Sequence, residues 1–173
     1  MGATTETSAR ADGPRFRSGR RVWALLAVGV GLGSVGIALW LQHRSDLLPC
    51  AWCVLQRLQA LVVVVLALLV VVLPGLAARF TGWLGVGVAI TGLAAALHQQ
   101  FNASKDLSCA LTLADRVVGS LGLDSRWPDV FQAQAMCNEA NVPWMGVPFA
   151  LWGAAMFIVL IVCLGVAATR ERA

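Results

Sequence analysis

Long apolar segments alternate with polar ones along this chain, and their lengths indicate its architecture. Four segments are almost entirely apolar, at residues 22–42, 50–73, 80–98 and 147–169. Each is close to the roughly 20 residues that an α-helix needs to cross about 30 Å of hydrocarbon. The pattern therefore predicts an all-α membrane protein in which four transmembrane helices form a single bundle over residues 22–169.

The residues at the ends of these segments favour four separate helices. Pro74 and Gly75 follow the second segment, and both are poor at continuing a helix. The first segment is longer than the roughly 7 to 15 residues of a signal-peptide core and ends without a small-residue cleavage site, so we interpret it as a transmembrane helix. In the third segment, Gly82, Gly85 and Ala89 have the spacing that lets helices approach closely in lipid. We expect this third helix to pack centrally.

The polar segments differ in length and character. Residues 1–21 have almost no large apolar groups and are predicted to form a flexible tail, and 170–173 form a second, short tail. The connection at 43–49 is short, whereas 99–146 forms a long loop. Apolar residues around Asp115 and Arg116 in this loop predict a short helix at the membrane interface. These apolar residues are Leu111, Leu113, Val117, Val118, Leu121 and Leu123.

Composition and charge suggest how the chain is oriented. It is 58% hydrophobic and 13% charged, whereas soluble domains are about half apolar and about a quarter charged. The net charge of +4 would also suit nucleic acid, but the arginines lie beside apolar segments, as the positive-inside rule requires. Both termini are therefore expected in the cytoplasm, with the loops at 43–49 and 99–146 in the periplasm or at the cell exterior. The expected cytoplasmic arginines are Arg10, Arg15, Arg17, Arg20, Arg21, Arg79, Arg170 and Arg172.

Four of the five cysteines fall where the chain is predicted to face outward. Cys50 and Cys53 form a CxxC pair at the start of the second span, and Cys109 and Cys137 lie in the long loop. Such a pair at a helix N-terminus favours a reactive thiolate, because unpaired amides supply partial positive charge. Two dithiols on the oxidising side of a membrane therefore indicate redox exchange. Cys163 lies deep in the fourth span, about 25 Å from the outer surface at 1.5 Å per residue, and is expected to be a packing residue.

Two alternatives use the same cysteines without redox exchange. Static disulfides could brace the loop, but a bridge gains most by closing a long stretch, and Cys50 and Cys53 enclose only two residues. A tetrathiolate zinc site would more typically contain a second closely spaced pair, which the stretch from Cys109 to Cys137 does not supply. We favour redox exchange and predict no metal site.

Arg57 is a charged residue inside a predicted span, at a spacing that places it on the same helix face as Cys50 and Cys53. A charge within a span is costly unless the side chain reaches the headgroups or has a function. We favour stabilisation of a thiolate or of a reduced anionic acceptor. A membrane dithiol must pass two electrons onward, and the mobile carrier of the bilayer is quinone. His43 and His98, at the outer ends of the first and third spans, are candidates for proton transfer, and His98 is also predicted to contact the quinone.

Two runs of residues then point to a known family. The first comprises Trp40, Leu41, Gln42 and His43, followed after five residues by Pro49, Cys50, Ala51, Trp52, Cys53 and, after three more residues, Arg57. The second comprises Trp127, Pro128, Asp129, Val130 and Phe131, then Cys137, Glu139, Trp144, Gly146, Pro148 and Trp152. With the cysteine order and the topology from Val22 onward, these runs closely resemble the DsbB family of bacterial disulfide-bond formation proteins. Trp52 is bulkier than the aliphatic residue often found there, and Gln56 stands where some members have an acid.

The resemblance implies a four-helix enzyme of the bacterial inner membrane. It would reoxidise a periplasmic thioredoxin-like thiol oxidase, DsbA or an equivalent, and reduce membrane quinone, either ubiquinone or menaquinone. By position, the thiol of the partner would attack Cys109. Cys137 would then pass the electrons on to Cys50. Cys53 would then be the thiolate that contacts the quinone ring, and Arg57 would bind the quinone.

Three other functions share parts of this pattern. Vitamin K epoxide reductase-like proteins do similar work, but in them the loop pair precedes the CxxC, and here it follows. An outward flow of reductant would need a cysteine route across the membrane, which Cys163 alone does not provide. A non-catalytic scaffold or metal-handling protein with Cys and His ligands at its outer face remains the alternative, and dependence on quinone separates it from an oxidase.

Overall fold

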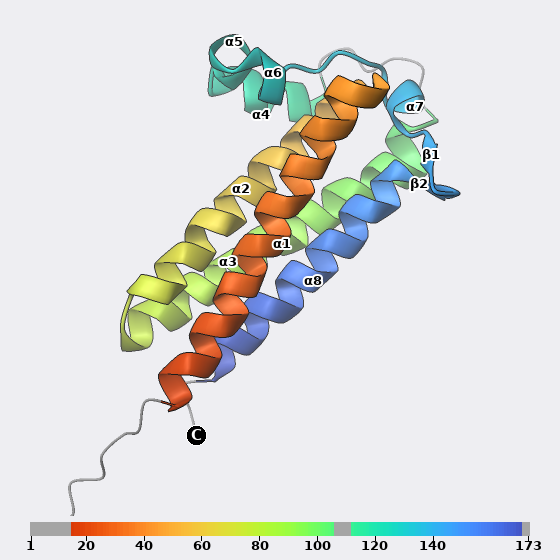
Figure 1. Ribbon diagram of the computed structural model, residues 1–173. Helices are drawn as coiled ribbons and strands as arrows, with labels where there is room; N and C mark the ends of the chain where they lie inside the picture. Colours follow the sequence, from red (N-terminus) through yellow and green to blue (C-terminus); the bar gives the residue numbers. More distant parts are fainter. Residues whose placement is uncertain (1–14, 106–111, 171–173) are drawn as a thin grey trace, which may run out of the picture.

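The computed structural model describes residues 15–105 and 112–170, and within them four long helices form an antiparallel bundle (Figure 1). These are α1 (Arg15–Ser45), α2 (Ala51–Val72), α3 (Gly75–His98) and α8 (Phe149–Thr169). Segments of all four are long and apolar enough to cross a membrane. The predicted all-α, four-helix membrane bundle is confirmed.

The shorter elements gather at one end of the bundle, where α1 ends and α2 begins (Figure 1). They are η1, a π-helical turn (Gln99–Ala103), α4 (Leu113–Ser120), α5 (Leu123–Arg126), α6 (Pro128–Phe131), α7 (Cys137–Ala140), β1 (Pro143–Trp144) and β2 (Val147–Pro148). The two strands are antiparallel, with Trp144 opposite Val147. The helix expected near Asp115 is present as α4, and its first turn is fixed by a capping box between Thr112 and Asp115.

Several predicted boundaries need correction. Residues 43–45, assigned to the first loop, belong to α1, and residues 147–148, assigned to the fourth span, form β2. Residues 15–21, assigned to the flexible tail, belong to α1, and within them Arg20 makes a hydrogen bond to the end of α2. Arg20 is buried, and its Nη2 donates to the carbonyl of Leu73 at 3.1 Å, which satisfies an acceptor at the C-terminus of α2. The third helix begins at Gly75 rather than at residue 80, because Pro74 is its N-cap. Residues 99–103, assigned to the loop, continue the third helix as η1.

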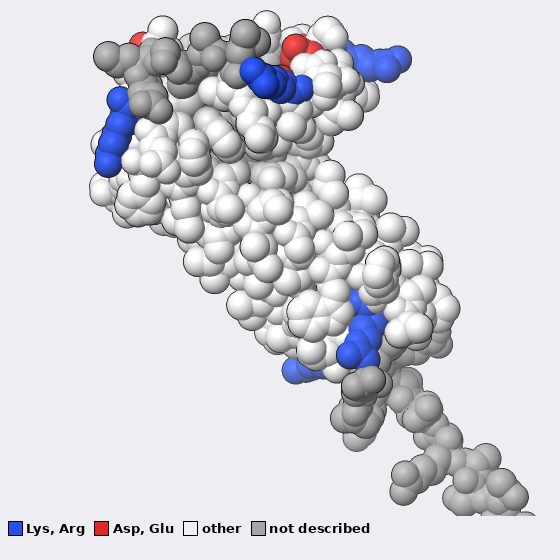
Figure 2. Space-filling model, turned by 180° about the vertical axis from the view of Figure 1, so that it is seen from behind, with Lys and Arg blue, Asp and Glu red and all other residues white. Residues whose placement is uncertain are grey.

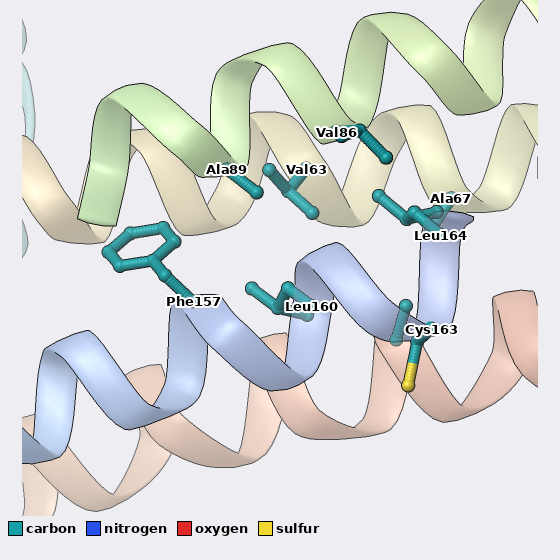
Figure 3. Packing of buried hydrophobic residues seen from close by; sticks show 9 residues of the cluster. Val63, Ala67, Val86, Ala89, Phe157, Leu160, Cys163 and Leu164 are labelled. Carbon is teal, nitrogen blue, oxygen red and sulfur yellow. The ribbon is translucent and has the colours of Figure 1, made fainter. Parts of the chain in front are cut away.

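Small residues on α3 bring this helix close to α8, as expected from its glycine spacing. A Cβ on Gly82 would lie 2.9 Å from Ala168, and one on Gly85 would lie 2.7 Å from Leu164. Gly92 faces the ring of Phe157 more closely still. Figure 3 shows the buried side chains around this contact, with Phe157, Leu160 and Leu164 of α8 directed toward α2 and α3. Van der Waals packing of this kind holds helices together in lipid.

Gly92→Ala is expected to destabilise the bundle, because the added methyl group would overlap the Phe157 ring. Overpacking a filled core costs about 1–3 kcal/mol, which corresponds to a fall of roughly 2–10 °C in the thermal unfolding midpoint. Gly87→Ala on the same helix is the matched control, since no described atom lies within 4 Å of its added Cβ. Equal shifts in the two variants would contradict this account of the α3–α8 packing.

The outer surface of the bundle is apolar between two charged ends. On the face shown in Figure 2, lysine and arginine side chains lie at the two ends, and a broad region without them separates the ends. Large apolar side chains such as Leu32, Val65, Ile90 and Ile158 are about half exposed along the four long helices. A belt of this kind suits contact with lipid tails.

Candidate active site

Two of the predicted site residues, Cys53 and Arg57, lie on the wall of a cavity with a volume of about 460 Å³. The wall is formed mainly by α1, α2 and α8 and is largely apolar. Its polar side chains come from Ser34, Cys53, Gln56, Arg57 and Gln99. A mostly apolar cavity with a few converging polar groups is the usual form of a small-molecule site.

Three sulfur atoms meet beside this cavity, at the beginning of α2. Cys50 is the N-cap of α2, and its Sγ lies 3.1 Å from the Sγ of Cys53 one turn later. Cys137, the first residue of α7, forms a side-chain hydrogen bond with Cys50. Cys50 and Cys53 are free thiols, and Cys50 and Cys137 are fully buried. The structure therefore brings a loop cysteine to the CxxC pair, whereas Cys109 lies outside the described residues.

The backbone around Pro49 explains why Cys137 reaches this position. The carbonyl oxygen of Pro49 accepts two hydrogen bonds, from the amide of Gln134 at 2.9 Å and from the amide of Ala135 at 3.2 Å. These bonds place the segment before Cys137 against the residue before Cys50. Ala103 of η1 packs against both cysteines and completes the buried cluster.

The surroundings of Cys50 favour its protonated form. Its hydrogen bonds with Cys137 and Cys53, together with its burial, raise the pKa of the Cys50 thiol far above its usual range. The family resemblance implies that Cys53 is the thiol of the pair that ionises.

Arg57 is 7% exposed and is fixed by two hydrogen bonds from the same nitrogen. Its Nη1 donates to Oε1 of Gln42 on α1 at 2.8 Å and to the carbonyl of Val130 on α6 at 3.1 Å. Gln42 in turn donates to the carbonyl of Asp129 at 3.1 Å. Arg57 therefore does not extend to the surface, and it connects the cavity wall to the loop segment.

Gln99 is a site residue that sequence analysis missed. Its side chain is fully buried in η1, and its Nε2 donates to the Sγ of Cys53 at 3.1 Å. Its Oε1 accepts a hydrogen bond from Nε2 of Gln56 at 2.6 Å. The signal that the sequence offered was a glutamine directly after an apolar span. In the structure this residue begins a π-helical turn, and such turns often mark functional sites.

The other candidate residues lie apart from this group. His98 is exposed, its ring lies 4.6 Å from that of Trp52, and it is not among the described residues that line the cavity. His43 is also exposed, and its Nδ1 is 2.8 Å from the carbonyl of Leu39. Cys163 is buried in the bundle core beside Leu160 and Leu164 (Figure 3).

Comparison with known proteins assigns the chain to a family. Residues 20–167 match the family model described as Disulfide bond formation protein DsbB. The chain belongs to the DsbB family. Disulfide bond formation protein B of Ralstonia nicotianae is 31% identical over 91% of this chain and 99% of its own length. Disulfide bond formation protein B 1 of Pseudomonas entomophila is 32% identical over 91% of this chain and 96% of its own. No solved structure matches.

Membership in the DsbB family, together with the four apolar helices, establishes the general role of the chain. It is a multi-pass membrane protein and a disulfide oxidoreductase that functions in disulfide bond formation. The matched region contains Cys50, Cys53, Cys109, Cys137 and Arg57.

Proposed function

We propose that this DsbB-family chain reoxidises a DsbA-like, thioredoxin-like thiol oxidase and transfers the electrons to membrane quinone. The supporting observation is the continuous line of groups from Cys137 through Cys50 to Cys53, which ends at the cavity wall beside Arg57. Thiol–disulfide exchange needs sulfur atoms in contact. Electron transfer to a lipid-soluble acceptor needs an apolar cavity next to the last sulfur.

The steps balance as two successive exchanges and one reduction. The partner's dithiol becomes a disulfide as the Cys109–Cys137 disulfide becomes a dithiol. That dithiol then reduces the Cys50–Cys53 disulfide. Cys137 attacks Cys50 and Cys53 leaves as a thiolate, after which Cys109 attacks Cys137, re-forms the loop disulfide and releases Cys50 as a thiol. The Cys50–Cys53 dithiol would return to its disulfide by giving two electrons and two protons to bound quinone, which would be released as quinol. The net change is one partner dithiol oxidised for each quinone reduced.

The cavity fits an acceptor of this kind. Apolar side chains of α1 and α8 line most of it, and the polar groups lie in its wall near Cys53. Arg57 is positioned to donate to a quinone oxygen or to stabilise negative charge on Cys53, because α1 and α6 hold its guanidinium in place. We assign Cys50, Cys53, Cys109 and Cys137 to catalysis and Arg57 to the quinone. The exposed position of His98 favours a role outside the quinone contact.

In this proposal the protein lies in the bacterial inner membrane. The end that bears α4 to α7 faces the periplasm, where oxidising conditions maintain disulfides. The opposite end faces the cytoplasm with both tails, and there Arg20 binds the α2 terminus and Arg170 lies over the ring of Trp23. Residues 22–169 then form the membrane domain together with its two periplasmic loops.

The experiment that tests this function is a quinone-reduction assay. The full-length protein in lipid nanodiscs is supplied with a reduced thioredoxin-like oxidase and either ubiquinone or menaquinone. We expect catalytic turnover with at least one quinone and no turnover without the partner. Cys163→Ser is the matched cysteine control and should retain activity, because Cys163 lies in the core away from the proposed route. No turnover with either quinone, together with stoichiometric bound zinc, would favour the metal-handling alternative.

A further inference from the structure

The cavity wall contains two amide side chains, Gln56 and Gln99, whose hydrogen bonds run in one direction and end at Cys53. Gln56 on α2 donates through Nε2 to Oε1 of Gln99, and Gln99 donates through Nε2 to Sγ of Cys53. Both glutamines are buried, at 8% and 0% exposure. A buried amide has few alternative partners, so breaking either bond would be costly.

The first bond determines which end of the Gln99 amide faces the sulfur. An amide has a donor end and an acceptor end of nearly the same shape. In the structure Gln56 presents its Nε2 donor, and the oxygen of Gln99 faces Gln56 while its NH₂ group faces Cys53. An acid at position 56 would present an acceptor instead and would favour the opposite orientation. The orientation therefore depends on the residue that this chain has at position 56.

We propose that Gln99 is a catalytic residue that stabilises the Cys53 thiolate, and that Gln56 is the positioning residue that keeps its NH₂ group on the sulfur. A neutral thiol or disulfide sulfur is a weak acceptor, whereas a thiolate is a strong one, so this bond strengthens when Cys53 carries charge. The Gln56 bond polarises the Gln99 amide in the same sense. The inference rests on the proposed function for the importance of that thiolate.

A glycine on the opposite helix leaves space for this pair. A Cβ on Gly153 of α8 would lie 2.5 Å from Oε1 of Gln56. Gly153→Ala would therefore displace the Gln56 side chain without changing Cys53, Gln99 or Gln56. Gly165→Ala on the same helix is its matched control, since no described atom lies within 4 Å of the added Cβ.

The test measures thiolate directly, in reduced full-length protein without quinone or partner. One measurement is the alkylation rate of Cys53 by iodoacetamide at pH 7, resolved by peptide mass spectrometry. The other is the ultraviolet absorbance of thiolate that is lost on acidification. Gln99→Leu keeps a side chain of similar size but removes the donor. We expect it to lower the alkylation rate about tenfold, the size of a charge-assisted hydrogen bond, with a parallel loss of absorbance.

The companion variants separate this role from a general packing effect. Gln56→Leu and Gly153→Ala should lower both signals by about threefold or more, since a misoriented amide loses part of a charge-assisted bond. Gln59→Leu, on α2 but bonded to Thr91, should leave both signals unchanged. If Gln99→Leu does not fold, Gln56→Leu and Gly153→Ala decide the matter. Unchanged signals in the folded variants, or an equal loss in Gln59→Leu, would overturn the inference.

The outcome is independent of the oxidase assay. Loss of thiolate in Gln99→Leu, in a protein that fails to reduce any quinone, would support the inference and reject the proposed function. Quinone turnover combined with an unchanged thiolate signal in Gln99→Leu would do the reverse.

Discussion

Cys53→Ser and Cys50→Ser should each abolish quinone reduction, lowering turnover by at least about a thousandfold, as expected when a reaction loses its nucleophile. The sulfur atoms lie 3.1 Å apart at the start of α2, and in the proposed route every electron pair passes through both. Serine is close to cysteine in size, so the bundle should remain folded. The measurement is the initial rate of quinone reduction with reduced thioredoxin-like oxidase in excess.

A single-turnover experiment gives this prediction a sharper form. In either serine variant the loop pair can still exchange with the partner, so about one partner disulfide should form for each oxidised chain before the reaction stops. A chain with an inert loop pair would form none. Full steady-state activity in either variant would contradict the proposed route, provided that Cys163→Ser behaves like the unmodified protein.

Arg57→Ala should weaken the use of quinone more than the use of the partner. Losing a charged donor in a buried site costs roughly 1.5–3 kcal/mol, so we expect the apparent KM for quinone to rise about ten- to a hundredfold. The apparent KM for the partner should change much less, because Arg57 lies in the cavity wall. Steady-state rates measured while each substrate is varied in turn would separate the two effects.

Two further variants separate the charge of Arg57 from its geometry. Arg57→Lys retains a cation but loses the planar fork of donors and should recover only part of the quinone affinity. Gln42→Leu leaves the arginine in place and removes the acceptor that orients Nη1 at 2.8 Å, so it should produce a smaller rise in the KM for quinone. An unchanged quinone KM in Arg57→Ala would remove Arg57 from the site.

The features of this protein that could be predicted from its sequence depend on short-range patterns. The length of an apolar segment is nearly sufficient to define a transmembrane helix, because unsatisfied backbone groups are excluded from lipid. The CxxC spacing and the position of Arg57 on the same face are likewise properties of one helix. The close approach of α3 to α8 followed from Gly82 and Gly85, although their partners on α8 did not.

The features that could not be predicted depend on contacts between distant segments. No local pattern indicated that Gln134 and Ala135 would donate to Pro49, or that Gln42 would orient Arg57. The role of Gln99 depends on the backbone turn that follows His98, and an amide there looks like an ordinary interfacial residue. Charge patterning alone assigned residues 15–21 to a tail. They belong to the first helix, where Arg20 donates a hydrogen bond to the carbonyl of Leu73 at the end of α2.

The paired hydrogen bonds on the Pro49 carbonyl determine how far Cys137 can move from Cys50. The amide nitrogen of Ala135 lies 3.2 Å from the carbonyl oxygen of Pro49. Ala135 is two residues before Cys137, and Pro49 is directly before Cys50. While these bonds last, a dissociated Cys137 sulfur samples only the small volume that so short a chain allows. Its effective concentration at Cys50 is that of an intramolecular reactant, which in well-oriented systems reaches about 10⁵ M or more. In the proposed route, the exchange between Cys137 and Cys50 is then limited by chemistry rather than by a search, however long the remainder of the loop.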